Sequence, residues 1–390
     1  MKSFNFNQPT QLHFGWGRLN ETGRIISRVG KKCLLITEKP IPLMKSLFEK
    51  VKDVCTEAGM EVIHFDGVVA SASTDCINAG SKMAADNDVD VVLGVGGGST
   101  IDTAKGIAIG ATHEGDIWQY RLGGEQRVNR KKILPIVAIP TTAGTGAEVT
   151  NMSVIKNESL KKKSALAAWE ICPKVAIIDP EVTITMPSHL TASTGFDIFT
   201  HAFECTLNQI VQSYYVNLIA YDAIKLVIKY LPIAVKDGYN KEAREALSFA
   251  ATQGGLAICN CGTVLSHGID MAIGGHAKNI MHGEALALMY PAINKWTWKY
   301  AIKEYARIGR MLNPSLETKS DKVAAEKACN EMDNFLQNIG MYLSFEEKGV
   351  PESELEAIAN DSFITPNYKF HPIVATKEDV LDLLKKSYRR

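Results

Sequence analysis

The sequence carries no excess of charge of either sign, since 43 Lys and Arg residues face 43 Asp and Glu residues. No overall electrostatic field attracts nucleic acid or an anionic membrane, and we expect neither as a partner. The sequence also lacks a run of the roughly 18 apolar residues that a membrane-spanning helix needs. Its first residues lack the apolar core of a secretory signal.

The cysteines lack any spacing typical of a disulfide framework or a zinc ribbon. The eight of them are scattered along the chain, and the only close pair, Cys259 and Cys261, is too tight for a CxxC motif. Scattered free thiols are typical of a reducing compartment, so the composition favours a cytoplasmic protein.

The chain is too long for one hydrophobic core. At 390 residues, of which 46% are hydrophobic, it favours two globular domains. In the first half, short β-branched runs alternate with amphipathic stretches, which is typical of a parallel α/β sheet. The predicted strands are residues 32–37, 61–65, 89–95, 133–139 and 175–179. The predicted helices between them are residues 43–58, 75–87 and 101–109.

The pattern changes after Pro180 and Pro187, where strand signals almost vanish and apolar residues recur with a helical period. The clearest helical segments are residues 214–230, 241–256 and 321–339. Pro232 and Gly238 separate the first two of them. We therefore predict an α/β dinucleotide-binding domain over residues 1–185 and an all-helical domain over residues 186–390.

A glycine-rich loop, Gly96-Gly97-Gly98-Ser99, follows a predicted buried strand and opens a predicted helix. Glycines there allow a tight turn, and the helix N-terminus favours an anion such as a pyrophosphate. The alternative is a simple turn, because the loop does not match the GxGxxG fingerprint. No Lys-Ser or Lys-Thr pair follows, which excludes an ATPase P-loop.

A second polar loop follows the next strand and contains Thr141, Thr142 and Thr145. Its hydroxyls suit a diphosphate or a ribose, although a Ser/Thr-rich turn is the simpler interpretation. Glu38 ends the first strong strand, where an acidic residue accepts hydrogen bonds from the adenine-side ribose and repels a 2′-phosphate. This position favours NAD over NADP, although Lys39 beside it weakens the inference.

The second half contains a potential metal-binding pattern. Asp197 and His201 are four residues apart and would share one face of a helix. On its own such a pair is usually an ordinary surface pair. With His267 and His282, however, it forms a set of one carboxylate and three imidazoles, which suits Zn²⁺ or Fe²⁺ and is too rich in nitrogen for Mg²⁺ or Ca²⁺. Neutral imidazoles and one carboxylate would leave a divalent ion with net positive charge.

In order and spacing, these motifs closely resemble the iron-containing (group III) alcohol dehydrogenases. The resemblance extends from Phe14 to Asp379. It is carried by Gly96-Gly97-Gly98-Ser99 with Asp102, Thr141-Thr142-Ala143-Gly144-Thr145-Gly146, Asp179-Pro180-Glu181 with Met186-Pro187, Gly195-Phe196-Asp197 with His201 and Glu204, and His267 with His282-Gly283. It implies a Rossmann-like domain, a helical domain of the dehydroquinate synthase-like architecture, and an active site in the cleft between them.

The resemblance also implies the roles of individual residues. The metal would be held by Asp197, His201, His267 and His282. The implied dinucleotide contacts are Gly97, Gly98, Ser99, Asp102, Thr141, Thr142 and Thr145, with Lys163 near the phosphates and Asn151 on the nicotinamide side. The implied metal is Fe²⁺, with Zn²⁺ as the alternative, and the implied cofactor is NAD, with NADP as the alternative.

Three departures from the family pattern stand out. Ser71 lies where many members have an Asn-Pro pair, which leaves its cofactor contact open. Met271 replaces a histidine often credited with proton relay. The segment before His282 is one residue longer than usual and contains His276, which could supply the missing imidazole; we expect it to point to solvent instead.

The resulting hypothesis is a metal-dependent NAD(P) alcohol dehydrogenase or aldehyde reductase. Hydride would pass between nicotinamide and a small alcohol or aldehyde bound to the metal. The alternatives are a polyol or hydroxy-acid dehydrogenase of the same superfamily, a lyase of the dehydroquinate synthase type, and a metal- and nucleotide-binding protein without catalysis. The resemblance and the apolar surface of the helical half favour a homodimer or a higher homo-oligomer.

Overall fold

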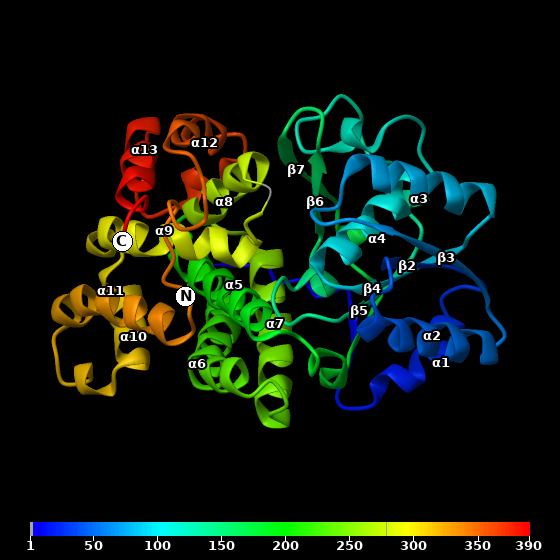
Figure 1. Ribbon diagram of the computed structural model, residues 1–390, viewed down its shortest axis with the longest axis horizontal. Helices are drawn as coiled ribbons and strands as arrows, with labels where there is room; N and C mark the ends of the chain where they lie inside the picture. Colours follow the sequence, from blue (N-terminus) through cyan, green and yellow to red (C-terminus); the bar gives the residue numbers. More distant parts are fainter. Residues whose placement is uncertain (1–2, 278) are drawn as a thin grey trace. The chain divides into compact units, whose positions relative to one another are not determined.

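The computed structural model describes residues 3–277 and 279–390, which form two compact units (Figure 1). The first unit is Asn7–Met186, and the second comprises Pro187–Arg390 together with residues 3–6. The first is an α/β unit and the second is helical.

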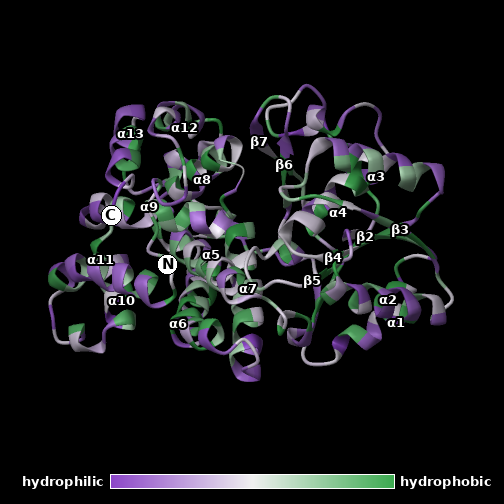
Figure 2. Cartoon of the chain, in the orientation of Figure 1, coloured by the Kyte–Doolittle hydropathy of each residue, from purple (hydrophilic) through white to green (hydrophobic). Residues whose placement is uncertain are grey.

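The α/β unit is built on a six-stranded sheet in the order β1-β8-β5-β4-β2-β3, in which every pair is parallel. The strands are β1 (Gln11–Phe14), β2 (Lys32–Glu38), β3 (Glu61–Val68), β4 (Val91–Gly96), β5 (Ile136–Pro140) and β8 (Val175–Ile178). All residues of β4 and β5 are buried, as expected when helices cover both faces of a parallel sheet. The green strands of Figure 2 show the same apolar character. The predicted α/β fold is confirmed.

Helices cover the two faces of this sheet in pairs. On one face α1 (Thr22–Ile26) and α2 (Pro42–Glu57) pack on apolar strand side chains such as Leu35 and Leu93. On the other face α3 (Thr74–Asp86) and α4 (Gly98–Gly110) pack on Leu34 and Val92. β3 and β4 lie on opposite sides of β2, so the order in which strands are added to the sheet reverses between β2 and β4. In open α/β sheets, ligands bind outside the carboxyl ends of the strands at such a switch point.

A two-stranded antiparallel hairpin, β6 (Met152–Asn157) and β7 (Lys162–Ala167), lies outside the main sheet. These two strands were not predicted from the sequence, because lysines interrupt their apolar alternation. The hairpin is fixed to α4 by Lys105, whose buried Nζ donates to Thr150 O and Met152 O at 2.9 and 2.7 Å. A buried ammonium is stable only when such acceptors surround it.

The described residues of the second unit form helices joined by turns and loops, without a strand. Its α-helices are α5 (Ser188–Leu207), α6 (Tyr214–Lys236), α7 (Lys241–Cys261), α8 (Leu265–His276), α9 (His282–Thr297), α10 (Ile302–Leu312), α11 (Asp321–Asn338), α12 (Leu355–Asp361) and α13 (Lys377–Lys386). The prediction that Pro232 separates two helices was wrong, because α6 continues through it. Proline removes one backbone donor, and the buried apolar face of α6 outweighs that loss.

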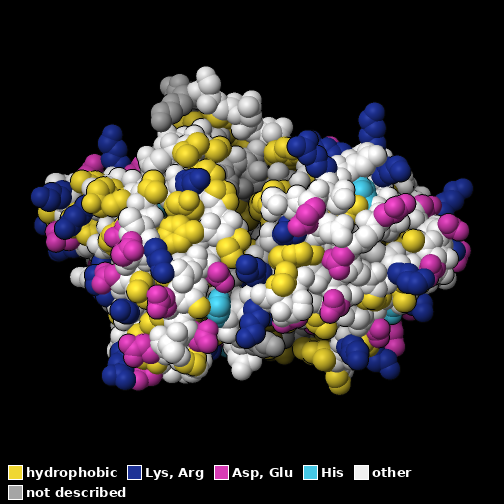
Figure 3. Space-filling model, turned by 90° about the horizontal axis from the view of Figure 1, so that it is seen from above, with side chains coloured by type: hydrophobic (Ala, Val, Ile, Leu, Met, Phe, Trp, Pro, Cys, Tyr) yellow, Lys and Arg dark blue, Asp and Glu magenta, His cyan; other side chains and the backbone are white. Residues whose placement is uncertain are grey.

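The charge on the surface is mixed (Figure 3) and the cysteines are unpaired, as the composition led us to expect. On the face seen in Figure 3, Lys and Arg side chains are interspersed with Asp and Glu, without a broad patch of one sign. All eight cysteines are free and buried. No single described helix is long and apolar enough to cross a membrane, although α7 and α8, bent by 102°, pass that test together on length and composition.

His371 generates a prediction about stability. It is buried beside Thr297, with its Nε2 2.9 Å from Thr297 Oγ1 and its ring stacked on Trp296. Burial lowers the pKa of His371 to about 3, whereas an unfolded histidine titrates near its ordinary value of 6.5. Below pH 6.5 the unfolded state therefore binds a proton that the folded state does not. The free energy of unfolding consequently decreases as the pH is lowered.

When the pH is lowered from 7.5 to 5, we expect protonation of His371 in the unfolded state to reduce the free energy of unfolding by about 2 kcal/mol. The measurement is urea unfolding of the wild type and His371→Gln at both pH values. The variant should be the less stable protein at pH 7.5, and the gap should shrink or reverse at pH 5. An equal gap at both pH values would show that His371 does not titrate in this way.

Candidate metal centre and dinucleotide loops

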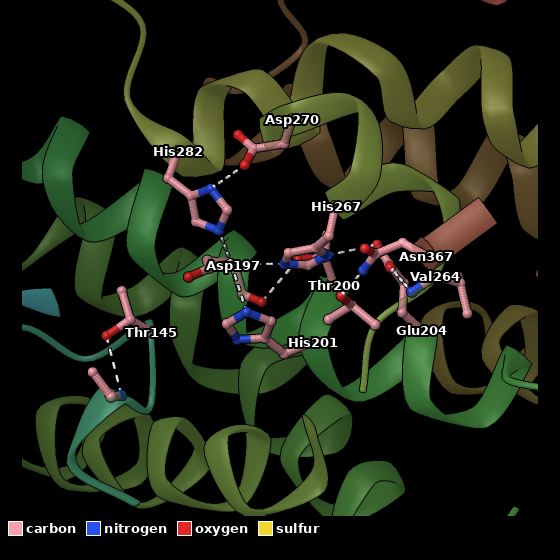
Figure 4. Close-up of polar contacts among 12 residues, drawn as sticks. Thr145, Asp197, Thr200, His201, Glu204, Val264, His267, Asp270, His282 and Asn367 are labelled. Carbon is pink, nitrogen blue, oxygen red and sulfur yellow. Dashed lines mark hydrogen bonds and ion pairs between the residues drawn. The ribbon is translucent and has the colours of Figure 1, made fainter. Parts of the chain in front are cut away.

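Four side chains of the helical unit converge on one point (Figure 4). Asp197 and His201 lie one turn apart on α5, His267 lies near the start of α8, and His282 is the first residue of α9. Their potential ligand atoms all lie within 4.8 Å of one another. The Nε2 atoms of His201, His267 and His282 are 3.3, 3.6 and 3.2 Å from Asp197 Oδ1.

These distances fit a shared cation. Oxygen and nitrogen donors at about 2.1 Å from one tetrahedral ion lie about 3.4 Å from each other. Two of the four donor atoms, Asp197 Oδ1 and His267 Nε2, are buried without a hydrogen-bond partner among the described residues. Such atoms are costly unless something compensates them, and a metal ion would do so. The donor set therefore fits a transition-metal ion.

Two further carboxylates contact the Nδ1 atoms of two of these histidines. Glu204 Oε1 lies 2.9 Å from His267 Nδ1, and Asp270 Oδ2 lies 2.6 Å from His282 Nδ1. Both carboxylates are buried. From the sequence, Glu204 was recognised only as part of the family motif, and Asp270 was not predicted. The one available signal was an aspartate within the otherwise apolar segment of α8.

The net positive charge expected for a metal-loaded site was derived from the four ligands alone. When all three imidazoles are neutral, as metal binding requires, the carboxylates of Asp197, Glu204 and Asp270 would give the cluster a charge of −3, and a divalent ion would leave −1. The site favours retention of a cation more strongly than its four ligands suggest.

The same charges shift the pKa values of the cluster. Burial alone would raise the pKa of Asp197, but His201 and His282 hold it well below its ordinary value. Burial lowers the pKa of His201 to about 4, against the opposing effect of Asp197. Burial acts in the same direction on His267, yet Glu204 and Asp197 raise its pKa to about 9.

Gly283 allows α9 to approach α5 closely. A Cβ atom at Gly283 would lie 2.0 Å from the backbone oxygen of Ser193 on α5. The start of α9, which carries His282, therefore touches the helix that carries Asp197. Only glycine permits this contact without displacement of one backbone.

In the α/β unit the two predicted loops lie side by side. The amide of Thr141 donates to Gly96 O at 3.0 Å, and a Cβ at Gly98 would lie 2.7 Å from Thr145 Cγ2. Gly97 is the N-cap of α4, so the first amides of that helix lack helical partners. This is the geometry of an anion-binding helix terminus.

The other predicted dinucleotide residues lie in varied surroundings. Ser71 has φ of 68° and donates its amide to Ser99 Oγ at 3.1 Å, which joins its loop to the start of α4. Glu38 is exposed at the carboxyl end of β2, at the switch point. Asp102 accepts from the amide of Val154 at 3.0 Å and so also fixes the hairpin.

Two predicted residues lie on or beside the hairpin. Asn151 immediately precedes β6, and its carbonyl accepts from the amide of Ala168. Lys163 pairs with Lys156 across the hairpin. Lys162 and Lys163 therefore belong to strand β7.

The expectation that His276 points to solvent was wrong. Its Nδ1 lies 3.1 Å from Glu354, its Nε2 lies 2.9 Å from Asp361, and its side chain is 15% exposed. Both ring nitrogens are therefore engaged at the C-terminus of α8. Met271 lies on the same helix and is partly buried.

A glycine-rich loop with the geometry of an anion site in one unit and four converging donor side chains in the other together suit a metal-dependent dehydrogenase. Residues 9–180 match the sequence model of the iron-containing alcohol dehydrogenases, and residues 191–388 match that of the C-terminal domain of the Fe-containing alcohol dehydrogenase family. The chain belongs to the iron-containing alcohol dehydrogenase family. The predicted oxidoreductase activity on alcohols is confirmed by this membership, which sets the lyase alternative aside.

Individual relatives cover nearly the whole chain. The chain is 32% identical to the NAD-dependent methanol dehydrogenase of Bacillus methanolicus, with 98% of this chain and 99% of the relative covered. It is 31% identical to the 1,3-propanediol dehydrogenase of Klebsiella pneumoniae, with 99% of each covered. The crystal structure of an archaeal alcohol dehydrogenase from a Red Sea brine pool matches with a TM-score of 0.93 and 30% identity, over 99% of this chain and all of that one.

The two glycines that follow His267 and His282 provide a matched test of helix approach. Gly283→Ala should force α9 away from α5 and cost about 1–3 kcal/mol, or roughly 2–12 °C in Tm. Gly268→Ala should cost much less, because its Cβ would meet no atom closer than 3.3 Å. Thermal unfolding of both variants checks this, and equal changes in Tm would contradict it.

Proposed function

We propose that this alcohol dehydrogenase holds Fe²⁺ on Asp197, His201, His267 and His282 and interconverts a small alcohol and its aldehyde with NAD. The observation that carries the proposal is the convergence of these four donors, with ligand atoms within 4.8 Å of one another. One carboxylate and three imidazoles suit Fe²⁺ and Zn²⁺ alike. The match to the iron-containing family favours Fe²⁺, with Zn²⁺ as the alternative.

The metal ligands and the carboxylates beside them would have different roles in the reaction. When bound, the metal would supply a Lewis acid for the substrate oxygen, on which negative charge develops during hydride transfer. Asp197 holds part of the compensating charge, and Glu204 and Asp270 orient two of the imidazoles. His282 is the most exposed of the four side chains, at 36%, so we propose that the substrate reaches the cluster past it.

For the α/β unit we propose the dinucleotide contacts Gly97, Gly98, Ser99, Asp102, Thr141, Thr142, Thr145, Asn151 and Lys163, with Ser71 beside Ser99. The adjacent loops after β4 and β5 and the free amides of α4 support a diphosphate there. The nicotinamide of NAD would accept hydride from the alcohol and return it to the aldehyde. Residues 1–185 would thus form the dinucleotide-binding domain and residues 186–390 the metal-binding domain.

Glu38 supports NAD in preference to NADP. It ends β2 at the switch point, where its exposed carboxylate would accept hydrogen bonds from a ribose and repel a 2′-phosphate. The relative from Bacillus methanolicus is named as NAD-dependent.

The names of the relatives support small alcohols as substrates. They include methanol and 1,3-propanediol dehydrogenases, so a short diol is a second candidate beside a simple primary alcohol. This keeps open the polyol alternative within the family.

We also propose a homo-oligomer in a reducing, cytoplasmic compartment. Apolar and aromatic side chains are exposed around the start of α6, where Tyr214, Tyr215 and Leu218 are 54%, 46% and 51% exposed. Such a cluster suits contact with a second copy. Eight free, buried thiols suit a reducing environment.

The metal centre is tested by Asp197→Ala and His267→Ala, each reloaded with Fe²⁺ or Zn²⁺ after removal of bound metal. Both variants should bind less than about a tenth of the wild-type metal and lose activity on an aldehyde panel with NADH, while they remain folded. Metal content, NADH oxidation and circular dichroism are the measurements. His189→Ala is the control, because His189 is exposed on the same helix. Full activity in Asp197→Ala would refute the site.

Coenzyme preference is tested at Glu38. Glu38→Ser should raise the ratio of NADPH to NADH efficiency about tenfold, because it removes charge repulsion of about 1.4 kcal/mol. Lys39→Ser is the neighbouring control and should lower the ratio or leave it unchanged. A rise in Lys39→Ser without one in Glu38→Ser would contradict the assigned role. Values of kcat/KM for both coenzymes provide the measurement.

A further inference from the structure

The three histidines of the cluster differ in what their Nδ1 atoms contact. His267 and His282 each face a buried carboxylate through Nδ1. His201 Nδ1 is buried and has no hydrogen-bond partner among the described residues. We propose that Asp270 and Glu204 are positioning residues that fix two of the metal ligands, and that Asp270 decides how tightly the metal is retained. This inference rests on the proposed metal site.

The contact between Asp270 and His282 is short and shielded from solvent. The distance from Oδ2 to Nδ1 is 2.6 Å, and the Asp270 side chain is only 2% exposed. An Nδ1–H that donates to a carboxylate leaves the Nε2 lone pair free, and Nε2 is the atom that faces Asp197 at 3.2 Å. The carboxylate therefore fixes both the tautomer and the direction of the ring.

His282 needs this support more than the other histidines do. It is the first residue of α9, and its side chain is 36% exposed, whereas those of His201 and His267 are 5% and 9% exposed. Packing therefore restrains the ring of His282 least. Asp270 lies on α8, three residues after His267, so one helix supplies both a ligand and the support for a ligand on the next helix.

Glu204 does the same for His267 but also has a structural role. Its Oε2 accepts from the amide of Val264 at 2.6 Å, which ties α5 to the residue before α8. Glutamine at this position would face one of the two donors, His267 Nδ1 or the Val264 amide, with an NH₂ group. Glu204→Gln is therefore expected to lose fold stability as well as metal, and Asp270 provides the cleaner test.

The experiment compares wild type, Asp270→Asn and Asp270→Ala, each stripped of metal and titrated with Co²⁺ as the only probe. Asparagine can still accept from Nδ1–H but lacks the charge, whereas alanine removes the acceptor. We expect metal affinity to fall about 10-fold in Asp270→Asn and about 100-fold in Asp270→Ala. The visible absorption of bound Co²⁺ should also change in Asp270→Ala, because a loosened His282 alters the ligand field.

Asp333→Asn is the matched control, since Asp333 is a little-exposed carboxylate of the same unit that pairs with Lys295 at 3.1 Å. It should keep wild-type Co²⁺ affinity and absorption. Equal affinity and absorption in wild type and both Asp270 variants would overturn the inference and leave the metal site intact. Failure of the wild type itself to bind Co²⁺ would instead overturn the proposed function. If Asp270→Ala does not fold, the nearly isosteric Asp270→Asn decides the question alone.

Discussion

One buried carboxylate surrounded by imidazoles, Asp197, is the point at which three helices of the second unit meet. Asp197 is 1% exposed, and burial of an ionised group is costly unless other groups compensate its charge. Its Oδ1 lies within 3.6 Å of three imidazole nitrogens that come from three different helices. The positions of α5, α8 and α9 are therefore coupled, because a shift of any one of them would leave this charge less compensated.

Such a cluster requires helices that approach one another closely, and small residues make this possible. At Gly283 the start of α9 touches the backbone of α5, which brings the short imidazole of His282 within reach of Asp197. The α/β unit uses a similar contact between Gly98 and Thr145, where two loops after neighbouring strands pack together. In both units, glycine serves close approach between segments, and the polar groups beside it gain their geometry from that approach.

Local features of the chain could be predicted from the sequence, and contacts across long separations could not. Buried strands such as β4 are visible as β-branched runs, and the pairing of Asp197 with His201 follows from helical spacing. His267 and His282 were grouped with that pair by residue type, and the family resemblance decided the grouping, because nothing local links them to α5. The partners of His276 lie 78 and 85 residues further along the chain, so solvent was the natural but wrong expectation.

Asp270 was missed for a related reason, and its role changes the view of the site. Counted from the ligands alone, the cluster would leave a divalent cation with excess positive charge; the three buried carboxylates reverse that balance. A carboxylate behind an imidazole makes the ring a stronger donor, which favours retention of the metal but moderates its power as a Lewis acid. His201 has no such carboxylate. Two imidazoles of the cluster thus have a buried carboxylate at Nδ1, whereas His201 has none, and we expect His267 and His282 to bind a cation more firmly than His201 does.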